Sequence, residues 1–312
     1  MNTSVNVPLY DELPLIQELD IRHSWNVLPA SLGTLAFITH SSVLRGVASV
    51  KNGELLSLNL GIGEFTPPLF GRTAHELKLF ESSRNIFEDL IDQFNPQSSS
   101  QWDGLLHIRA REFGFYSGIT DLEEARKKLG IHHVAKHAIA GRGILLDIPR
   151  WRESAGIPWD PFSGECIEVE EIIQIMSAKD VQTQPGDILC VRTGWLTKYR
   201  SLQNLSEPLP NSDTPFSGIA SHHSMARFLW NNQFAAICSD NPAVESAPGD
   251  SKNGSLHRRL IPGLGFALGE LLDLDLLAQK CNERFSDYFQ FIAAPLVLEG
   301  GASSSANAVA VL

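Results

Sequence analysis

The chain has 312 residues, of which 43% are hydrophobic and 20% charged, and its formal net charge is −11 at pH 7. This composition permits a large buried core and excludes disorder of the chain as a whole. The negative charge excludes a general electrostatic attraction to nucleic acid. The sequence has neither an apolar run of the roughly 18 residues that a membrane span needs nor an apolar leader behind a basic flank, so we expect a soluble, cytoplasmic protein.

In the first hundred residues, two apolar runs predict strands, at 32–39 and at 54–60. A loop rich in proline and glycine follows at 65–72. The polar stretch 95–100 predicts a second loop, which leads the chain into the segment Gln-Trp-Asp-Gly-Leu-Leu-His at 101–107. Loops that enter polar clusters of this kind often carry chemistry.

In the second half, short apolar runs bounded by Gly, Asp or Pro predict buried strands. They lie at 143–148, 187–193, 234–239 and 288–298. Helical patterns lie between them, at 169–178, with acids in the first turn, and at 222–231, with Ser221 as the expected N-cap. The alternation indicates an α/β protein. Because no repeat divides the chain, we expect a single domain over residues 1–312.

The cysteines are far apart in the sequence, at Cys166, Cys190, Cys238 and Cys281. Their spacing predicts neither a disulfide framework nor a zinc ribbon, and three of them stand in apolar runs. We therefore expect buried free thiols. A catalytic cysteine is a weaker alternative, because nothing near any of the four would activate a thiolate.

The most informative cluster is Gln101, Asp103 and His107, which places an amide, a carboxylate and an imidazole within seven residues that also include Trp102 and two leucines. Polar groups among apolar neighbours need partners, so a structural Asp and His are one interpretation. A metal site or an acid/base pair is the other.

Two further polar residues stand out in the last third, His257 and Glu270. Glu270 lies in an otherwise apolar run, where a carboxylate is costly unless it is paired, protonated or bound to a cation. Asp240 follows the apolar run 234–239, and strand ends are where α/β proteins place ligand-binding groups, so Asp240 is a second-rank candidate.

The other histidines of interest are expected at caps or on the surface, except His137, which is a weak candidate for lining a cleft; they are His132, His133, His222 and His223. No Gly-x-Gly-x-x-Gly opens a βαβ unit, and neither a Gly-x-Ser-x-Gly elbow nor a Walker loop is present. Nucleotide-binding and serine hydrolase functions are therefore not indicated. Aromatic residues near the motif suggest an apolar pocket wall, although such residues are more often core: Trp102, Phe113, Phe115 and Tyr116.

The segment 101–107 resembles one branch of the cyclase-like metal hydrolases, the group that includes kynurenine formamidase. Their hallmark is His-x-Gly-Thr-His-x-Asp-x-x-x-His, of which Asp103 and His107 keep the last part, and the branch reads Gln-Trp-Asp-x-Leu-x-His. The resemblance covers nearly the whole chain, through residues 32–34, 137–147, 186–195, 239–245, 256–257, 269–270, 294–296 and 300–301.

The resemblance implies one divalent metal ion, zinc or manganese, with Asp103, His257 and Glu270 at positions that match the family's ligands. Gln101 stands where the family has its second metal-binding histidine, and Gln97 stands at the first. A neutral amide oxygen is a harder and weaker donor than imidazole, which favours manganese or magnesium relative to zinc. The resulting hypothesis has Gln101, Asp103 and His257 as metal ligands, with His107 and Glu270 as catalytic groups.

The resemblance also implies an α/β fold of the swivelling β/β/α type, in which a mixed sheet curls into a partial barrel with helices packed outside. Family members are commonly dimers or tetramers, so a homodimer or homotetramer is expected. The expected partner is a small-molecule substrate, with no nucleic acid and no membrane.

The function that these residues favour is metal-assisted hydrolysis of an amide, cyclic amide or lactone of a small metabolite, for example one of secondary metabolism. The alternative is a metal-independent cyclase, dehydratase or isomerase that uses Asp103, His107 and Glu270 as acid/base groups. A non-catalytic binding protein is a third class, and the persistence of the four candidate site residues argues against it.

Overall fold

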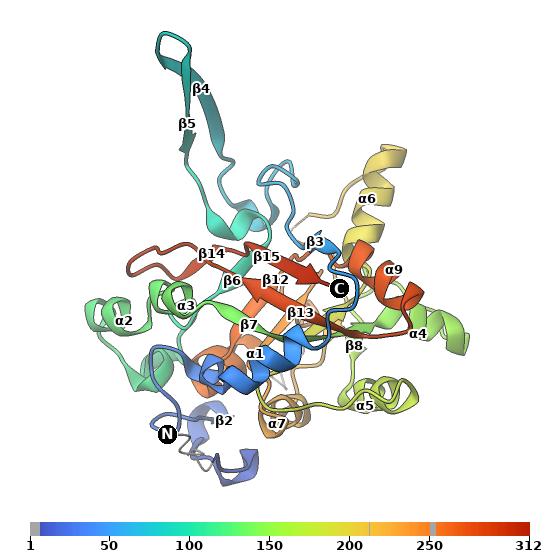
Figure 1. Ribbon diagram of the computed structural model, residues 1–312. Coiled ribbons are helices and arrows are strands. Elements are labelled where there is room, and N and C mark those ends of the chain that lie inside the picture. The colour runs from blue at the N-terminus through green and yellow to red at the C-terminus, as the bar shows by residue number, and fades with distance from the viewer. Residues whose placement is uncertain (1–6, 212, 250–253) are drawn as a thin grey trace.

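The computed structural model describes residues 7–211, 213–249 and 254–312. Its centre is one nine-stranded sheet whose strands come from positions between 55 and 311 of the chain, in the order β14-β6-β12-β11-β9-β7-β13-β15-β3. The four strands β12, β11, β9 and β7 are parallel, and the strands on either side of them pair antiparallel. The sheet curls into a half-barrel with helices outside it (Figure 1), so the predicted α/β architecture is confirmed.

The bounds of the sheet strands are β3 Leu55–Ser57, β6 Gln101–Asp103, β7 Ile139–Asp147, β9 Ile188–Arg192, β11 Ala236–Ser239, β12 Ala267–Glu270, β13 Tyr288–Ala293, β14 Ser303–Ser305 and β15 Ala308–Val311. Short pairs lie outside this sheet: β1 Leu15–Ile16 with β2 Ile21–Arg22, and β8 Cys166–Ile167 with β10 Gly218–Ile219. The helices are α1 His40–Val47, α2 Leu122–Leu129, α3 His132–His137, α4 Ile148–Ala155, α5 Val169–Ala178, α6 Trp195–Leu205, α7 His223–Asn231, α8 Leu256–Arg258 and α9 Asp275–Glu283.

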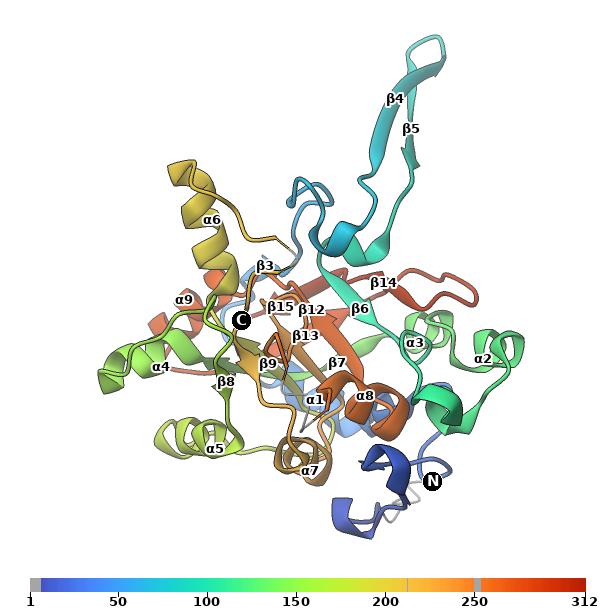
Figure 2. The ribbon, with the colours of Figure 1, turned by 180° about the vertical axis from the view of Figure 1, so that it is seen from behind.

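The central strands are buried on both faces because their apolar side chains alternate between two cores. In β9, Leu189 and Val191 join the core beneath α5 and α7, whereas Ile188 and Cys190 join a second core that includes residues of α3 and α9. Trp102 lies in the second core, fully buried. Figure 2 shows α7 and α8 on the same side of the sheet, seen from behind. Among the described residues, no helix has the length and apolarity to cross a bilayer.

The predicted elements of the second half are largely confirmed. The helix 169–178 is α5, with the predicted bounds, and the predicted strands at 143, 187 and 234 correspond to β7, β9 and β11. The predicted strand at 288 ends at Ala293 rather than Leu298, since Pro295 lacks the N–H that a strand ladder needs. Ser221 is not the cap of α7: the N-cap is His222, and its side chain makes no capping bond.

The prediction of a strand at 32–39 is wrong. The segment forms a 3₁₀ helix, Gly33–Phe37, followed by α1 from His40. Gly33 has a φ of +53°, and a Cβ there would lie 1.9 Å from the carbonyl oxygen of Gly265. This close approach of two backbones, which only glycine allows, breaks the extended conformation. The prediction at 54–60 is confirmed in part, as β3.

Two strands that the sequence did not indicate form a long hairpin, β4 Glu76–Ser83 and β5 Ile86–Asp92. It rises from the body next to β6 and β14, and every residue of both strands is exposed (Figure 1). The chain enters it from the loop at 65–72 and leaves it toward Gln101.

Candidate active site

The pairing of β6 with β12 brings three polar side chains to one face of the sheet. In this antiparallel pair Gln101 lies opposite Glu270, and Asp103 lies opposite Leu268. Opposed residues share a face, and residues two apart in a strand do so as well. The Gln-x-Asp spacing therefore directs Gln101 and Asp103 to the same side as Glu270. All three are buried.

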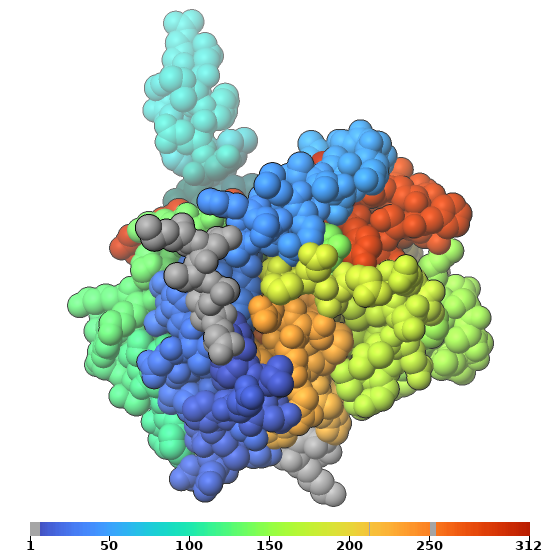
Figure 3. All heavy atoms as spheres, turned by 60° about the horizontal axis from the view of Figure 1, so that its bottom comes forward, coloured from blue at the N-terminus to red at the C-terminus, as the bar shows by residue number. Residues whose placement is uncertain are grey.

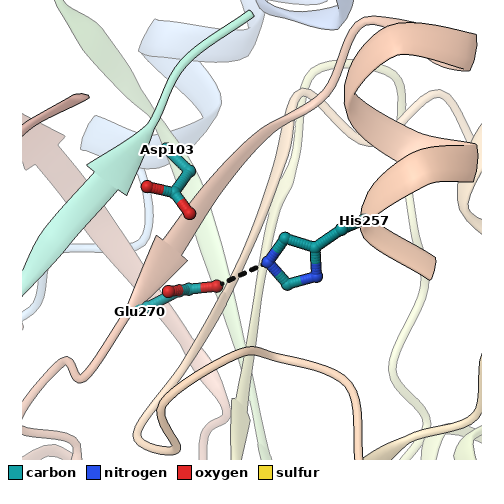
Figure 4. A group of neighbouring side chains, drawn as sticks. All are labelled: Asp103, His257 and Glu270. Carbon is teal, nitrogen blue, oxygen red and sulfur yellow. Dashed lines mark hydrogen bonds and ion pairs between the residues drawn. The ribbon is translucent and has the colours of Figure 1, made fainter. Parts of the chain in front are cut away.

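His257 reaches this group from the short helix α8. Its Nε2 lies 2.9 Å from Oε1 of Glu270, and its Nδ1 lies 2.6 Å from Oε1 of Glu245. Glu245 also accepts hydrogen bonds from the backbone N–H groups of Leu256 and His257, so it fixes both the start of α8 and the imidazole. Figure 4 shows Asp103, His257 and Glu270 converging from β6, α8 and β12.

His107 joins the site through Gln97. The Gln97 side-chain nitrogen donates to Oδ1 of Asp103 at 2.7 Å and lies 3.1 Å from Nδ1 of His107. Nε2 of His107 lies 3.2 Å from Oδ2 of Asp103. With Nδ1 as the acceptor, the proton of the His107 ring is on Nε2 and faces Asp103.

Gln101 uses only half of its amide. Its nitrogen donates to Oε2 of Glu270 at 2.5 Å, which fixes that carboxylate. Its oxygen is buried and has no hydrogen-bond partner in the described part of the chain. A buried amide oxygen without a donor in the protein is uncommon, and a water, an ion or a ligand usually satisfies it.

The charges at the site are coupled. Burial, together with the nearby charge of Glu270, raises the pKa of Asp103 to about 6. Burial also lowers the pKa of His107, so its imidazole is neutral at pH 7. Burial opposes charge on His257, yet hydrogen bonds to Glu245 and Glu270 raise its pKa well above the usual value. Burial raises the pKa of Glu245, but the hydrogen bond from His257 outweighs this effect and the pKa is lowered.

Four of the site residues line a cleft of ≈ 490 Å³, namely Asp103, His107, His257 and Glu270. Phe70, Phe216 and several prolines form an apolar part of its wall, and Asp213 and Thr214 also line it. Arg72 also lines the cleft. Burial lowers the pKa of its guanidinium, and the negative charges of Glu270 and Asp103 offset part of this effect. The cleft therefore combines apolar wall surface, the cation of Arg72 and a group of two carboxylates and two histidines.

Several sequence candidates lie elsewhere. Asp240 is buried and accepts hydrogen bonds from the backbone of Thr193 and Gly194, so it holds the start of α6 and does not line the cleft. His137 bonds the carbonyl of Ala138, away from the cleft. The aromatic residues proposed as pocket wall do not line the cleft, and three of them are core: Trp102, Phe115 and Tyr116.

Sequence reasoning missed Glu245 and Arg72. Glu245 ends the segment Ser-Asp-Asn-Pro-Ala-Val-Glu at 239–245, which carried part of the family resemblance, so the signal was present but not assigned a role. Arg72 closes the loop 65–72, and only the fold brings that loop to the cleft. The cysteines are free as expected, with three buried and Cys166 half-buried.

The donor set fits a divalent cation. One ligand atom each from Asp103, His257 and Glu270 lie within 4.8 Å of one another. Two carboxylates and an imidazole suit zinc or manganese. The geometry thus places Glu270 among the potential ligands, whereas Gln101 contacts Glu270 through its nitrogen.

Known proteins share this architecture. A crystal structure described as that of a novel cyclase is 24% identical with a TM-score of 0.79, and the match covers 93% of this chain and 99% of that one. Isatin hydrolase A from Labrenzia aggregata, bound to benzyl benzoate, is 14% identical with a TM-score of 0.58, covering 85% and 95%. An isatin hydrolase bound to the product analogue thioisatinate is 14% identical with a TM-score of 0.58, covering 88% and 99%. At these identities the likeness concerns the fold.

No curated protein sequence matches the chain. The sequence profile of the family described as "Putative cyclase" matches residues 30–246, more than two thirds of the chain. This chain therefore belongs to the cyclase family.

Proposed function

We propose that this protein is a metal-dependent hydrolase that cleaves an amide, a cyclic amide or a lactone of a small metabolite. The observation that carries the proposal is the buried group Asp103, His257 and Glu270 on the floor of the cleft. Such a concentration of charge in a buried place is costly unless a cation or a proton balances it. A divalent cation bound there would lower the pKa of a bound water and polarise a carbonyl oxygen.

The residues around this group have defined tasks. Glu245 holds Nδ1 of His257, so that Nε2 points at the site. The nitrogen of Gln101 orients Glu270. Gln101 is also the candidate fourth ligand, through its unpartnered oxygen.

His107 is the proton carrier of the proposal. It is neutral at pH 7 and lies at the cleft, with Nε2 toward Asp103. The neutral ring accepts a proton at Nδ1, the nitrogen that lies 3.1 Å from the Gln97 amide. His107 then returns the proton to the leaving nitrogen or oxygen.

Arg72 and the apolar wall suit the substrate class. Ring opening of a cyclic amide or lactone creates a carboxylate, and Arg72 is placed to pair with it. Phe70 and Phe216 form an edge-to-face pair with ring centroids 6.4 Å apart, and this pair offers apolar surface to the ring of a substrate. The isatin hydrolases that share the fold are named for a cyclic amide, which makes a compound of that class the first substrate to assay.

The test is the metal content of the purified protein by inductively coupled plasma mass spectrometry, after manganese or zinc supplementation. We expect about one ion per chain in the wild type and loss of the ion in Asp103→Ala. His107→Ala should keep the ion and lose most activity, since the histidine moves protons and is not a ligand. Gln101→Ala removes both the candidate amide ligand and the nitrogen that orients Glu270, so we expect weaker metal binding in this variant as well. Wild-type protein without metal, and active in the presence of chelators, would reject the proposal.

One observation favours a second function, that of a metal-independent cyclase, dehydratase or isomerase. His257 bridges two carboxylates, and Gln97 bridges Asp103 and His107, so side chains of the protein itself hydrogen-bond these groups. In this case Asp103, His107 and Glu270 act as acid/base groups. Full activity of metal-stripped protein would establish this function over the first.

A further inference from the structure

A second cavity, of ≈ 280 Å³, lies next to the cleft of the candidate active site. It is lined by residues 66–71, by Tyr199 of α6 and by residues 209–211. The cleft shares Phe70 with this cavity, and it is also lined by residues 213–216, which follow the last of these segments. The same two stretches of chain therefore flank both cavities, and Phe70 forms a wall of each.

Both cavities lie at one end of the molecule. The loop that includes residues 66–71 lies beside the base of the hairpin β4–β5 in Figures 1 and 2. After α6 the chain returns to this loop, and the ring of Phe216 meets that of Phe70 edge to face, with ring centroids 6.4 Å apart. The opposite end faces the viewer in Figure 3, where the N-terminal residues in dark blue form much of the surface. A molecule in the cleft thus has the second cavity as its neighbour.

The apolar surface continues from the cleft into the second cavity, because one hydrophobic cluster contributes to both. Leu69, Tyr199 and Leu209 belong to this cluster or pack against it, and they line the second cavity. Phe216 and Ala243 do the same on the side of the cleft. An apolar group that extends out of the cleft along this surface is removed from water, which favours its binding.

Tyr199 adds a polar group to the lining of the second cavity. The residue is 2% exposed, and its ring stacks on that of Trp195, with ring centroids 5.3 Å apart. Within residues 7–211, 213–249 and 254–312, no side chain or backbone group forms a hydrogen bond with its hydroxyl. Burial raises the pKa of Tyr199, so the hydroxyl keeps its proton. A hydroxyl without a protein partner on a lining residue is available to a ligand.

The size of the second cavity indicates what it can hold. An apolar cavity of about 150 Å³ binds benzene. At ≈ 280 Å³ the second cavity has room for a phenyl ring together with the atoms that connect it to a group in the cleft. Its lining of prolines, leucines and one tyrosine contains no charged residue, so it suits an uncharged aromatic group.

We propose that the second cavity is a subsite for an apolar, phenyl-sized group of the substrate, which lies beyond Phe70 from the bond that reacts in the cleft. Leu209 and Tyr199 are then residues that determine specificity, because they contact this group and not the reacting bond. The inference rests on the proposed function in one respect, since it takes the cleft as the place where the substrate reacts. Its test measures binding and requires no turnover.

The test is calorimetric titration of the full chain with four acids of increasing length, phenylacetate, 3-phenylpropionate, 4-phenylbutyrate and 5-phenylvalerate. Arg72 in the cleft is placed to pair with the carboxylate, and only the longer acids reach past Phe70 with their ring. We expect the best of the longer acids to bind at least about tenfold more tightly than phenylacetate, the gain that burial of a phenyl group provides.

Two variants fill the second cavity from its two flanking segments, Leu209→Trp and Thr66→Trp. Each should remove most of the gain, so that the ratio of the two affinities falls about tenfold or to near one. Leu205→Trp is the matched control: Leu205 is 68% exposed at the end of α6 and lines neither cavity, so the ratio should equal that of the wild type. Thr66 is exposed, so Thr66→Trp tests the subsite even where Leu209→Trp fails to fold.

A wild type that binds none of the acids, or binds all of them with one affinity, would overturn the inference. A gain that persists in folded Leu209→Trp or Thr66→Trp would overturn it as well, because the ring would then lie elsewhere. Failure of the proposed function has a different signature. Protein that holds no metal and hydrolyses nothing, yet shows the gain and loses it in the filled variants, would keep the subsite and reject the hydrolase.

Discussion

At the residue scale, Glu245 controls the site without facing it. Its carboxylate accepts hydrogen bonds from Nδ1–H of His257 and from two backbone N–H groups at the start of α8. An amide in this position presents an N–H to at least one of these donors, which misplaces the imidazole. We expect Glu245→Gln to weaken metal binding about 10–100-fold, the usual loss when the partner of a liganding histidine is changed. Competition with a chelating dye measures it.

The control for this variant is Glu168→Gln, which changes an exposed carboxylate that contacts His222 at 3.7 Å. It should bind metal as the wild type does. An unchanged metal affinity in Glu245→Gln would show that Glu245 serves only to hold the chain around α8.

The pKa of Asp103 predicts how metal binding depends on pH. Burial and the charge of Glu270 raise this pKa to about 6, so the carboxyl is ionised at pH 7 and mostly protonated at pH 5. A protonated carboxyl does not bind a cation. His257 acts in the same direction, since it must lose a proton before Nε2 can bind. We expect the metal affinity at pH 5 to be at least about tenfold below that at pH 7.

Calorimetry at pH 5, 6 and 7 measures this dependence, and the same titrations in two buffers at pH 7 report the released proton. Equal affinity at pH 5 and pH 7 would mean that neither Asp103 nor His257 is a ligand.

At the scale of elements, Gly269 sets the spacing between the strands that carry the site. It lies opposite Trp102 on β6 and Cys238 on β11. A Cβ at this position would lie 2.7 Å from Sγ of Cys238 and 3.3 Å from the ring of Trp102. Overpacking of this kind costs about 1–3 kcal/mol. We expect Gly269→Ala to lose that much stability in urea and to lose activity beyond it, because β12 must shift Glu270.

Gly61→Ala is the matched control. The nearest atom to a Cβ at Gly61 is Oε2 of Glu64, at 4.0 Å, so the substitution should change stability by less than about 0.5 kcal/mol. If Gly269→Ala were equally neutral, β12 would have more freedom to move than its contacts indicate.

The same elements explain how far the sequence could predict the fold. Strands β7, β9 and β11 were predicted because a strand buried on both faces is a continuous apolar run with clear ends. The hairpin β4–β5 was not predicted, because polar and apolar residues mix on both of its faces and the sequence pattern is therefore that of a loop. Gly33–Phe37 was mistaken for a strand, because its helical turn depends on Gly265, more than 200 residues away.

The candidate site was predicted to a similar extent. Asp103, His107, His257 and Glu270 meet in the cleft as the motif and the resemblance implied. Glu245 and Arg72 could not be assigned, because each acquires its role from a contact between segments far apart in the chain. Asp240 was favoured by its place at a strand end, but its hydrogen bonds serve the start of α6 instead.

At the scale of the whole molecule, the two ends of the parallel strands have different tasks. The site lies where β12 ends, at Glu270. At the opposite edge, Asp187 precedes β9 and is fully buried. Arg142 of β7 binds it with two hydrogen bonds, at 3.1 and 2.7 Å, and Arg45 of α1 lies 3.4 Å away. This ion cluster joins segments that the chain visits at positions 45, 142 and 187.

Asp187→Ala should therefore destabilise the fold and leave the site intact. Removing one partner of a buried ion pair costs about 3 kcal/mol or more, because the remaining charge stays in a partly dry place. For a domain of this size that corresponds to a fall in Tm of about 6–12 °C. Asp11→Ala is the control, since Asp11 pairs with Arg227 on the surface and its loss should leave the stability close to that of the wild type. Metal content and KM at 25 °C should match the wild type in both variants. A change in KM in Asp187→Ala would show that the two edges of the sheet are coupled rather than independent.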